Sequence, residues 1–305
     1  QRQMCIRDRG HIARLCAIAR PDIALVLNVG TAHVGELGSR DEIAASKGEI
    51  LEALPADGVA IINHDDGYAH VFRHLPACEV IDFGFDEGFV HAEDLHLDEM
   101  ARGAFELVIG ATRAHVDLRL LGEHHVGNAL AAAAIAHACG LGVDEIAVAL
   151  SGATGRSKWR MEHHELPNGV TLINDAYNAN PESMRSALRA LAAIGRERRT
   201  WAILGEMREL GASAVEEHDA IGRLAVRLDI SHLVAVGRMG KIMQIGAANE
   251  GSWGDEAAHV EDVDAAISYV LERWRSGDVV LVKASRSIGL ERVAEALIAA
   301  GSGKD

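Results

Sequence analysis

The sequence predicts an α/β protein built from two successive domains. Its 305 residues are enough for two hydrophobic cores, and 49% of them are apolar although only 4% are aromatic. Continuous apolar runs, such as residues 22–29, alternate with helical patterns, which is typical of strands buried on both faces of a parallel sheet. The segment 151–155, Ser-Gly-Ala-Thr-Gly, has the composition of a linker, and the alternation begins again after it.

In the first domain, a strand, a helix and a further strand imply a right-handed parallel βαβ unit. Three runs with alternating apolar residues, at 79–83, 89–97 and 104–119, predict an antiparallel appendage at the edge of this sheet. The other elements expected here are helices over 11–19, 40–54, 123–139 and 143–150, strands over 22–29 and 59–63, and a short helix after the second strand.

The second domain is predicted to be a doubly wound, Rossmann-like α/β domain of about 150 residues. Strands are expected near 160–166, 169–175, 200–204, 232–236 and 278–283, and helices near 181–194, 213–228, 238–248, 261–274 and 289–300.

Composition excludes several functional classes. The net charge of −15 argues against a nucleic-acid or anionic-membrane binder, which would need clustered Lys and Arg. No apolar run approaches the roughly 18 residues of a membrane span. The four cysteines are widely separated, so neither a zinc site nor a disulfide framework is expected, and a cytoplasmic location is predicted. Residues 1–9 are polar and lack periodicity, and we interpret them as a non-native or junction segment.

Two constellations in the first domain carry candidate chemistry. Asn28 and His33 lie on the loop that leaves a buried strand, where an amide and an imidazole can face one ligand. Lys47 lies next to a glycine on an otherwise apolar helical face. It is either a surface lysine with a buried stem or a desolvated amine, and a desolvated amine can take up carbon dioxide and become a carbamate ligand for magnesium.

The densest polar cluster is Asn174-Asp-Ala-Tyr-Asn-Ala-Asn-Pro181, at a strand-to-helix junction. Asn180 and Pro181 are suited to the N-cap and first turn of the following helix. Ligands of open α/β sheets bind at such junctions. Arg160, fifteen residues before Asp175, is a suitable clamp for a polyphosphate. No phosphate-binding GxxxxGK[ST] motif is present in the sequence.

Taken together, the motifs resemble the Mur ligase family, in particular its MurF type, from Gly10 to about residue 300. The motifs that carry the resemblance are NVGTAH, ASKGEI, GNALAAAA, DAYNANPESM, GEMRELG followed by His218, and LVKASRS, in that order. The resemblance implies an incomplete central ATPase domain over 10–157, mostly a parallel sheet with helices and an antiparallel appendage, and a Rossmann-like C-terminal domain over 158–305. It also implies that a UDP-substrate domain and the phosphate loop would precede Gly10, so that this chain alone is expected to be inactive.

The reaction implied by the resemblance is ATP-dependent amide-bond formation. The MurF type adds D-Ala-D-Ala to UDP-N-acetylmuramoyl-tripeptide through an acyl phosphate, in peptidoglycan precursor synthesis. The resemblance further implies a monomer that uses ATP and magnesium. The alternatives are a non-catalytic nucleotide- or peptide-binding module, and another ligase of the Mur or folylpolyglutamate type.

The resemblance assigns roles residue by residue. Lys47, as a carbamate, and His33 are the expected metal ligands and form the catalytic group together with Asn28, which supports their loop. Asn128 is the expected adenine contact. The other expected nucleotide contacts are Arg160, Asp175, Tyr177, Asn178 and Asn180, and the residues expected to close the cleft on the substrate are Lys283, Ser285 and Arg286.

Overall fold

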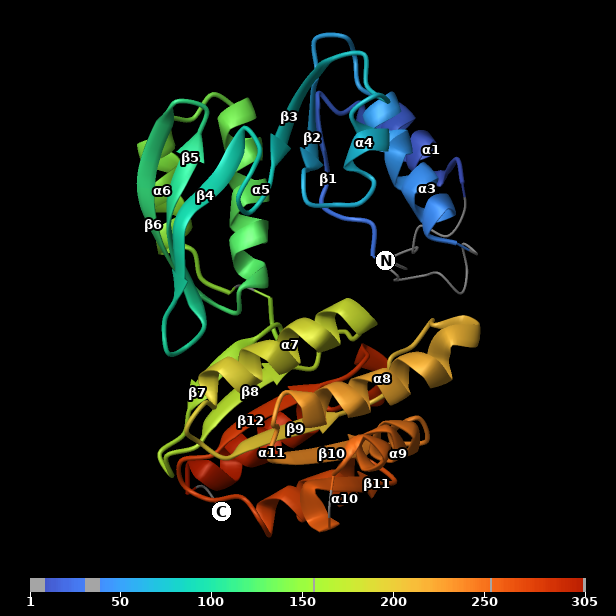
Figure 1. Ribbon diagram of the computed structural model, residues 1–305, viewed down its shortest axis with the longest axis vertical. Helices are drawn as coiled ribbons and strands as arrows, with labels where there is room; N and C mark the ends of the chain where they lie inside the picture. The colour runs from blue at the N-terminus through green and yellow to red at the C-terminus, as the bar shows by residue number, and fades with distance from the viewer. Residues whose placement is uncertain (1–8, 31–38, 156, 253, 304–305) are drawn as a thin grey trace. The chain divides into compact units, whose positions relative to one another are not determined.

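The computed structural model describes residues 9–30, 39–155, 157–252 and 254–303, and these form two compact units. Unit 1 comprises Gln1–Asp98 and Arg102–Thr154, and unit 2 comprises Glu99–Ala101 and Gly155–Asp305. Both units are α/β, as the sequence predicts, and each contains one six-stranded sheet (Figure 1).

The sheet of unit 1 is mixed, with the strand order β1-β2-β3-β4-β5-β6. Strands β1 to β3 are parallel, β3 and β4 meet at the single parallel pair Phe83–Val90, and β4 to β6 are antiparallel. The strands are β1 Ile23–Val26, β2 Val59–Asn63, β3 Glu79–Phe83, β4 Val90–Leu97, β5 Arg102–Ile109 and β6 Thr112–Leu121.

Two expectations for this sheet were wrong. Residues 79–83 belong to its parallel part, because alternation along a strand does not encode the direction of its partner. The run 104–119 is a hairpin of two strands, which turns at Gly110, where φ is 57°. The antiparallel appendage exists and consists of β4, β5 and β6.

The sheet of unit 1 curls around one helix. Helix α5 contacts all six strands (Figure 1). Its buried face is made of small residues with one leucine, including Ala129, Leu130, Ala133 and Ala134, which let the strands approach its backbone closely. The helices of unit 1 are α1 His11–Ala19, α3 Arg40–Glu52, α4 Ala69–Phe72, α5 His124–Ala138 and α6 Val143–Gly152.

Unit 2 is doubly wound, with the strand order β11-β10-β9-β12-β8-β7 and only the edge strand β7 antiparallel. The strands are β7 Glu162–Glu165, β8 Thr171–Asp175, β9 Thr200–Leu204, β10 His232–Val236, β11 Ala257–Val260 and β12 Val279–Lys283. The α-helices are α7 Pro181–Ile194, α8 Ala214–Arg227, α9 Gly240–Glu250, α10 Val263–Leu271 and α11 Glu291–Gly301. The sequence analysis did not anticipate β11.

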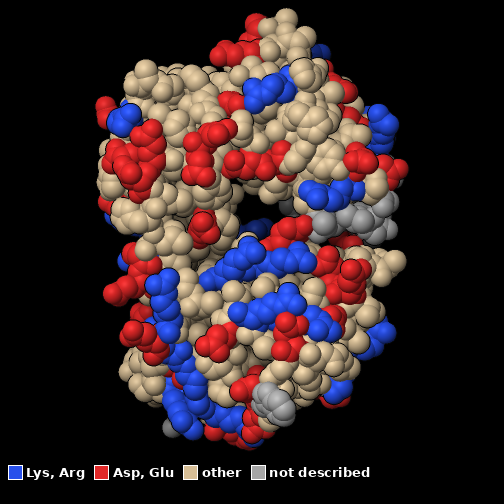
Figure 2. Space-filling view, in the orientation of Figure 1, with Lys and Arg blue, Asp and Glu red and all other residues tan. Residues whose placement is uncertain are grey.

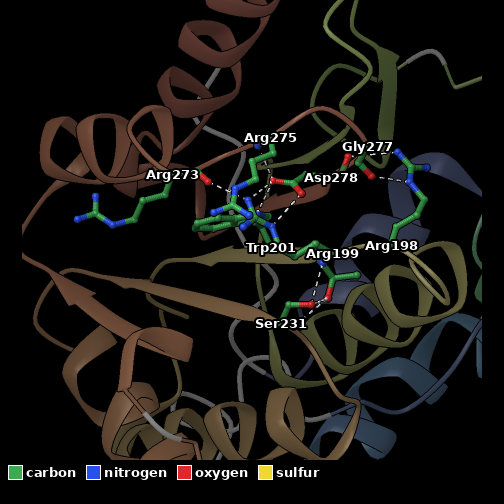
Figure 3. A network of polar contacts seen from close by, with 9 residues as sticks. Arg198, Arg199, Trp201, Ser231, Arg273, Arg275, Gly277 and Asp278 are labelled. Carbon is green, nitrogen blue, oxygen red and sulfur yellow. Dashed lines mark hydrogen bonds and ion pairs between the residues drawn. The ribbon is translucent and has the colours of Figure 1, made fainter.

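A network of hydrogen bonds and ion pairs connects the amino ends of the central strands of unit 2 (Figure 3). Asp278 is buried, and its carboxylate accepts hydrogen bonds from Arg199 Nε at 3.0 Å, from Trp201 Nε1 at 2.8 Å and from the Arg275 amide at 2.8 Å. Arg198 donates to the carbonyl of Gly277 at 2.7 Å. Because the buried carboxylate is fully engaged by donors, this network anchors β12 to β9 at the edge opposite the strand ends that carry the candidate site.

Helix α7 begins as the sequence predicts. The side-chain oxygen of Asn180 accepts a hydrogen bond from the Ser183 amide at 2.8 Å, the Asn180 amide donates to the Ser183 hydroxyl at 3.1 Å, and Pro181 occupies the first turn. This capping box fixes where β8 ends and the helix starts, and therefore fixes the intervening polar loop.

Charged side chains are unevenly distributed (Figure 2). Acidic residues are spread over the visible face of unit 1, whereas basic residues gather over α7 and α8 in unit 2. Several of those arginines are paired: Arg185 with Glu217 at 2.6 Å, and Arg223 and Arg227 with Glu250 at 3.2 and 2.7 Å. Among the described residues, no helix has the length and apolar character that crossing a bilayer requires.

Candidate functional site

The carboxyl ends of β8 and β12 form the centre of the candidate site. Asp175 and Lys283 are partners in the register of these parallel strands, so their side chains leave the sheet side by side. Lys283 Nζ donates to Asp175 Oδ2 at 2.5 Å and to the Asn178 carbonyl at 2.9 Å. The side chain of Lys283 is 2% exposed and that of Asp175 is 13% exposed. Burial lowers the pKa of Lys283, whereas the adjacent Asp175 carboxylate opposes that change.

The turn before β7 brings Arg160 into the same cluster. Trp159 and Met161 have φ values of 59° and 48°, a left-handed conformation that costs energy for such side chains. The turn is held because the Met161 amide donates to Asp175 Oδ1 at 3.1 Å and the Tyr177 amide donates to the Trp159 carbonyl at 3.0 Å. Arg160 consequently stacks on the Tyr177 ring, with its guanidinium carbon 4.2 Å from the ring centroid, and its side chain stays exposed.

A second arginine stacks on the Trp159 indole. The guanidinium carbon of Arg286 is 3.8 Å from the Trp159 ring, and Arg286 Nη1 is 2.8 Å from Glu291 Oε1. Two stacked arginines beside a buried Lys–Asp pair form a positively charged, partly exposed surface. Guanidinium groups in this arrangement suit recognition of phosphate oxygens.

Ser285 joins three loops. It is buried, its hydroxyl accepts from the Arg208 amide at 2.9 Å and donates to the Ala179 carbonyl at 3.4 Å, and its amide donates to the Glu206 carbonyl at 3.0 Å. These contacts tie the ends of β8, β9 and β12 together.

The two asparagines of the β8–α7 loop differ in their surroundings. Asn180 uses its side-chain oxygen to cap α7, as described above. Asn178 is exposed, and its carbonyl is held by Lys283. The structure therefore assembles Arg160, Asp175, Tyr177, Asn178 and Lys283 at one sheet edge.

In unit 1, four side chains hold the segment that follows β1. Lys47 Nζ donates to the Asn28 carbonyl at 2.6 Å, and Asn63 donates to the Leu27 carbonyl at 3.0 Å. The Val29 amide donates to Asp66 at 2.7 Å, and Arg40 donates to the Val29 carbonyl at 2.9 Å. Because side chains engage these backbone groups, β1 ends at Val26, earlier than the sequence predicts.

Lys47 therefore contacts the backbone of Asn28. His33 lies outside the described residues, so its distance from Lys47 is not part of the structure. Asn128 lies exposed in the first turns of α5. Within the described ranges, no group of three or more His, Cys, Asp or Glu side chains is arranged for a metal ion.

Sequence reasoning gave no role to His218, beyond its place in a motif. The imidazole is fully buried in α8, and its Nε2 accepts from the Met207 amide at 2.9 Å. A histidine with small neighbours on an amphipathic helix was the one feature of the sequence from which its burial could have been predicted.

Two family profiles match the chain. The Mur ligase middle domain matches residues 4–136, and the Mur ligase glutamate ligase domain matches residues 159–286. UDP-N-acetylmuramoyl-tripeptide–D-alanyl-D-alanine ligase of Mycobacterium tuberculosis is 47% identical over 97% of this chain and 62% of that protein. The ligase of the same name from Mycobacterium leprae is 44% identical over 98% of this chain and 63% of its own length.

Solved structures agree. The crystal structure of MurF from Acinetobacter baumannii aligns with a TM-score of 0.87 at 30% identity, covering 96% of this chain and 63% of that protein. MurF ligase from Thermotoga maritima in complex with ADP aligns with a TM-score of 0.82 at 26% identity, covering 96% of this chain and 65% of that one. The chain therefore spans less than two thirds of the length of these relatives. With both profiles in sequence order and the matching fold, the chain belongs to the Mur ligase family and carries its middle and glutamate-ligase domains.

Proposed function

We propose that this chain serves a MurF-type reaction, the ATP-dependent addition of D-Ala-D-Ala to UDP-N-acetylmuramoyl-tripeptide. The observation that carries the proposal is the cluster of Arg160, Tyr177, Asp175 and Lys283 at one sheet edge, in a chain 47% identical to mycobacterial ligases of that name. In the proposed reaction, a carboxylate of the tripeptide attacks the γ-phosphate of ATP and releases ADP, and the amine of D-Ala-D-Ala then displaces inorganic phosphate from the resulting acyl phosphate and loses a proton.

The residues of unit 2 would bind and orient the nucleotide. The exposed guanidinium of Arg160 is available to phosphate oxygens, and its stacking on Tyr177 limits the conformations that binding must freeze out. Asp175 and Lys283 would act together: the ion pair keeps the β8–α7 loop in place, with Asn178 in its middle and Asn180 at its end. Arg286, stacked on Trp159, would add charge complementary to the developing phosphoryl anion. Ser285 would hold the neighbouring loops for closure, and Asn128 on α5 is the proposed adenine contact.

Magnesium is proposed to bind in unit 1. Lys47, a half-buried residue, fits this role as a carbamate, because its Nζ reaches the carbonyl of Asn28 at the start of the segment that leads to His33. A carbamate would replace the cationic amine with two oxygen donors, which hard cations prefer. When bound, the ion would offset the negative charge of the triphosphate.

The proposal includes a cytoplasmic, monomeric protein without nucleic-acid or membrane partners. The described cysteines, Cys16, Cys78 and Cys139, are free thiols, which suits a reducing compartment.

The choice of amine substrate tests the proposed reaction. The matching 62% of the Mycobacterium tuberculosis ligase is replaced by this chain, and phosphate release from ATP is measured with UDP-N-acetylmuramoyl-tripeptide and different amines. We expect release with D-Ala-D-Ala and none with single amino acids. Release with a single amino acid would favour another Mur-type ligase, and nucleotide binding without any turnover in a folded hybrid would favour a binding module.

Lys47 can be tested without turnover. The chain is incubated with ¹³C-labelled bicarbonate, and we expect a carbamate carbon resonance that is absent from Lys47→Arg but retained in Lys241→Ala, whose lysine lies on α9. In the hybrid, Lys47→Ala should lower the turnover by at least about a hundredfold, because a metal clamp contributes several kcal/mol to such reactions. A carbamate signal in Lys47→Arg would contradict this assignment.

A further inference from the structure

His218 supports the loop that follows β9 from inside unit 2. The imidazole is 0% exposed and lies in the second turn of α8. Nδ1 is 2.6 Å from the carbonyl of Ala214, which can only accept, so this nitrogen carries the hydrogen. Nε2 therefore has a free lone pair, and it accepts from the Met207 amide at 2.9 Å. The two contacts together require one neutral tautomer.

The loop held in this way comprises Glu206–Leu210 and follows β9. Met207 and Leu210 are buried, so their backbone groups have little access to water. Other polar groups of the loop have different partners. The Arg208 amide donates to the Ser285 hydroxyl, the Glu206 carbonyl accepts from the Ser285 amide, and Glu206 Oε1 accepts from the Met239 amide at 3.1 Å. The Met207 amide depends on His218, and a buried amide without an acceptor is costly.

Charges around the imidazole are few. Glu206 from the loop and Glu217 from α8 favour a proton on the ring, and Glu217 is itself paired with Arg185 of α7. Burial outweighs them and lowers the pKa of His218. A protonated Nε2 is a donor and cannot accept a hydrogen bond from the Met207 N–H. Protonation must therefore break the contact that holds the loop.

We propose that His218 is a positioning residue whose neutral imidazole holds the Glu206–Leu210 loop in the shape that joins the ends of β9, β10 and β12. The shape of the loop follows from the contacts above. Its use, presenting Arg208 and Ser285 at the edge where nucleotide and amine would bind, rests on the proposed function.

Nuclear magnetic resonance of the isotopically labelled chain tests the support directly. In the wild type we expect the hydrogen on Nδ1 and a slowly exchanging Met207 amide. Lowering the pH through the His218 titration should reduce the protection of that amide relative to its intrinsic exchange rate, which itself falls with pH. His218→Gln keeps an acceptor near the position of Nε2, whereas His218→Asn is too short to reach Met207. Exchange of the Met207 amide should be about fivefold faster in the Asn variant, because one lost hydrogen bond costs on the order of 1 kcal/mol, and close to wild type in the Gln variant.

His232→Asn is the matched control, because His232 stacks on Trp201 at the amino ends of the strands and should leave Met207 exchange unchanged. A hydrogen on Nε2 in the wild type, or equal exchange in the Asn variant and the wild type, would overturn the inference.

In the active hybrid, the acid-side loss of kcat/KM should move to lower pH in His218→Gln, and an unmoved profile would overturn the use assigned to the loop. An inactive hybrid with the expected Met207 exchange would instead count against the ligase proposal alone.

Discussion

At the scale of single residues, the structure shows which residues of the separate sequence motifs contact one another. The sequence places Asp175 and Lys283 after two buried strands, and their pairing follows once these strands are neighbours in register. It does not encode that neighbourhood, since 108 residues separate the two side chains. It does reveal the capping role of Asn180, but not that Ser285 uses its side chain to bond neighbouring loops, because those bonds depend on loop geometry.

The Asp175–Lys283 pair should be important for the stability of unit 2. Asp175→Asn leaves a buried ammonium without its counter-charge, and we expect a loss of about 3 kcal/mol in the free energy of unfolding. Asp175→Asn with Lys283→Met should recover part of that loss. All four tryptophans follow residue 155 in the sequence, so tryptophan fluorescence during urea unfolding reports on unit 2.

The matched control for this cycle is Asp264→Asn, whose exposed carboxylate pairs with Arg292. Exposed pairs contribute less than about 1 kcal/mol. Equal losses in Asp175→Asn and Asp264→Asn would show that the buried pair has no special role.

Asp82 should make the stability of unit 1 depend on pH. Burial by itself would raise the pKa of Asp82, but hydrogen bonds from Arg73, the Phe89 amide and His64 outweigh it and lower the pKa to about 2, below the ordinary 3.8. Its contribution is therefore present above the ordinary pKa and is lost as the pH falls through the folded value, and it amounts to about 2 kcal/mol.

Circular dichroism during urea unfolding checks this expectation in wild type and Asp82→Asn. The stability difference should be full at neutral pH and should shrink as the pH approaches about 3. Asp117 carries an exposed carboxylate in the same unit, so the stability of Asp117→Asn should differ little from that of the wild type at either pH. A stability difference for Asp82→Asn that does not change with pH would contradict the assignment.

At the scale of elements, the strongly patterned segments were predictable and the weak ones were not. Strands β8, β9 and β12 are almost wholly buried, and α7 has a complete capping box, so apolar continuity and cap residues were sufficient to identify them. Strand β11 has only four residues, of which three are partly exposed, and its apolar signal was too short to detect. The direction of pairing of β3 depended on its connections, which a local pattern does not record.

Helices α8 and α9 pack through reciprocal glycines. A Cβ on Gly222 would collide with the Met243 carbonyl, and one on Gly246 would collide with the Asp219 carbonyl. Gly222→Ala should therefore destabilise unit 2 by about 1–3 kcal/mol, although alanine is the better helix former, because backbone atoms cannot yield like a side chain.

Gly152→Ala is the control for the close packing of these helices. This glycine is helical in unit 1 and has open space at its Cβ position. We expect its thermal midpoint to stay at or slightly above the wild-type value, while that of Gly222→Ala falls. An unchanged midpoint for Gly222→Ala would mean that the two helices can separate at no cost.

At the scale of the whole molecule, family membership rests on two domains in order, and the proposed activity rests on the residues at the strand ends of each domain. The fold class and the division into two sheets were predictable from alternation and from the linker composition. The proposed chemistry could be inferred from the sequence only because several short motifs occur together, since each alone is compatible with a structural role.

The central claim is that this chain contributes these two domains to a D-Ala-D-Ala-adding ligase. The most direct measurement is the mass of the nucleotide product that the hybrid with the Mycobacterium tuberculosis ligase forms from isotopically labelled D-Ala-D-Ala. We predict a UDP-linked product that carries the intact labelled dipeptide, formed only with ATP and abolished by Lys47→Ala but not by Lys241→Ala. A folded hybrid that attaches a single amino acid instead, or forms the same product without ATP, would contradict this account.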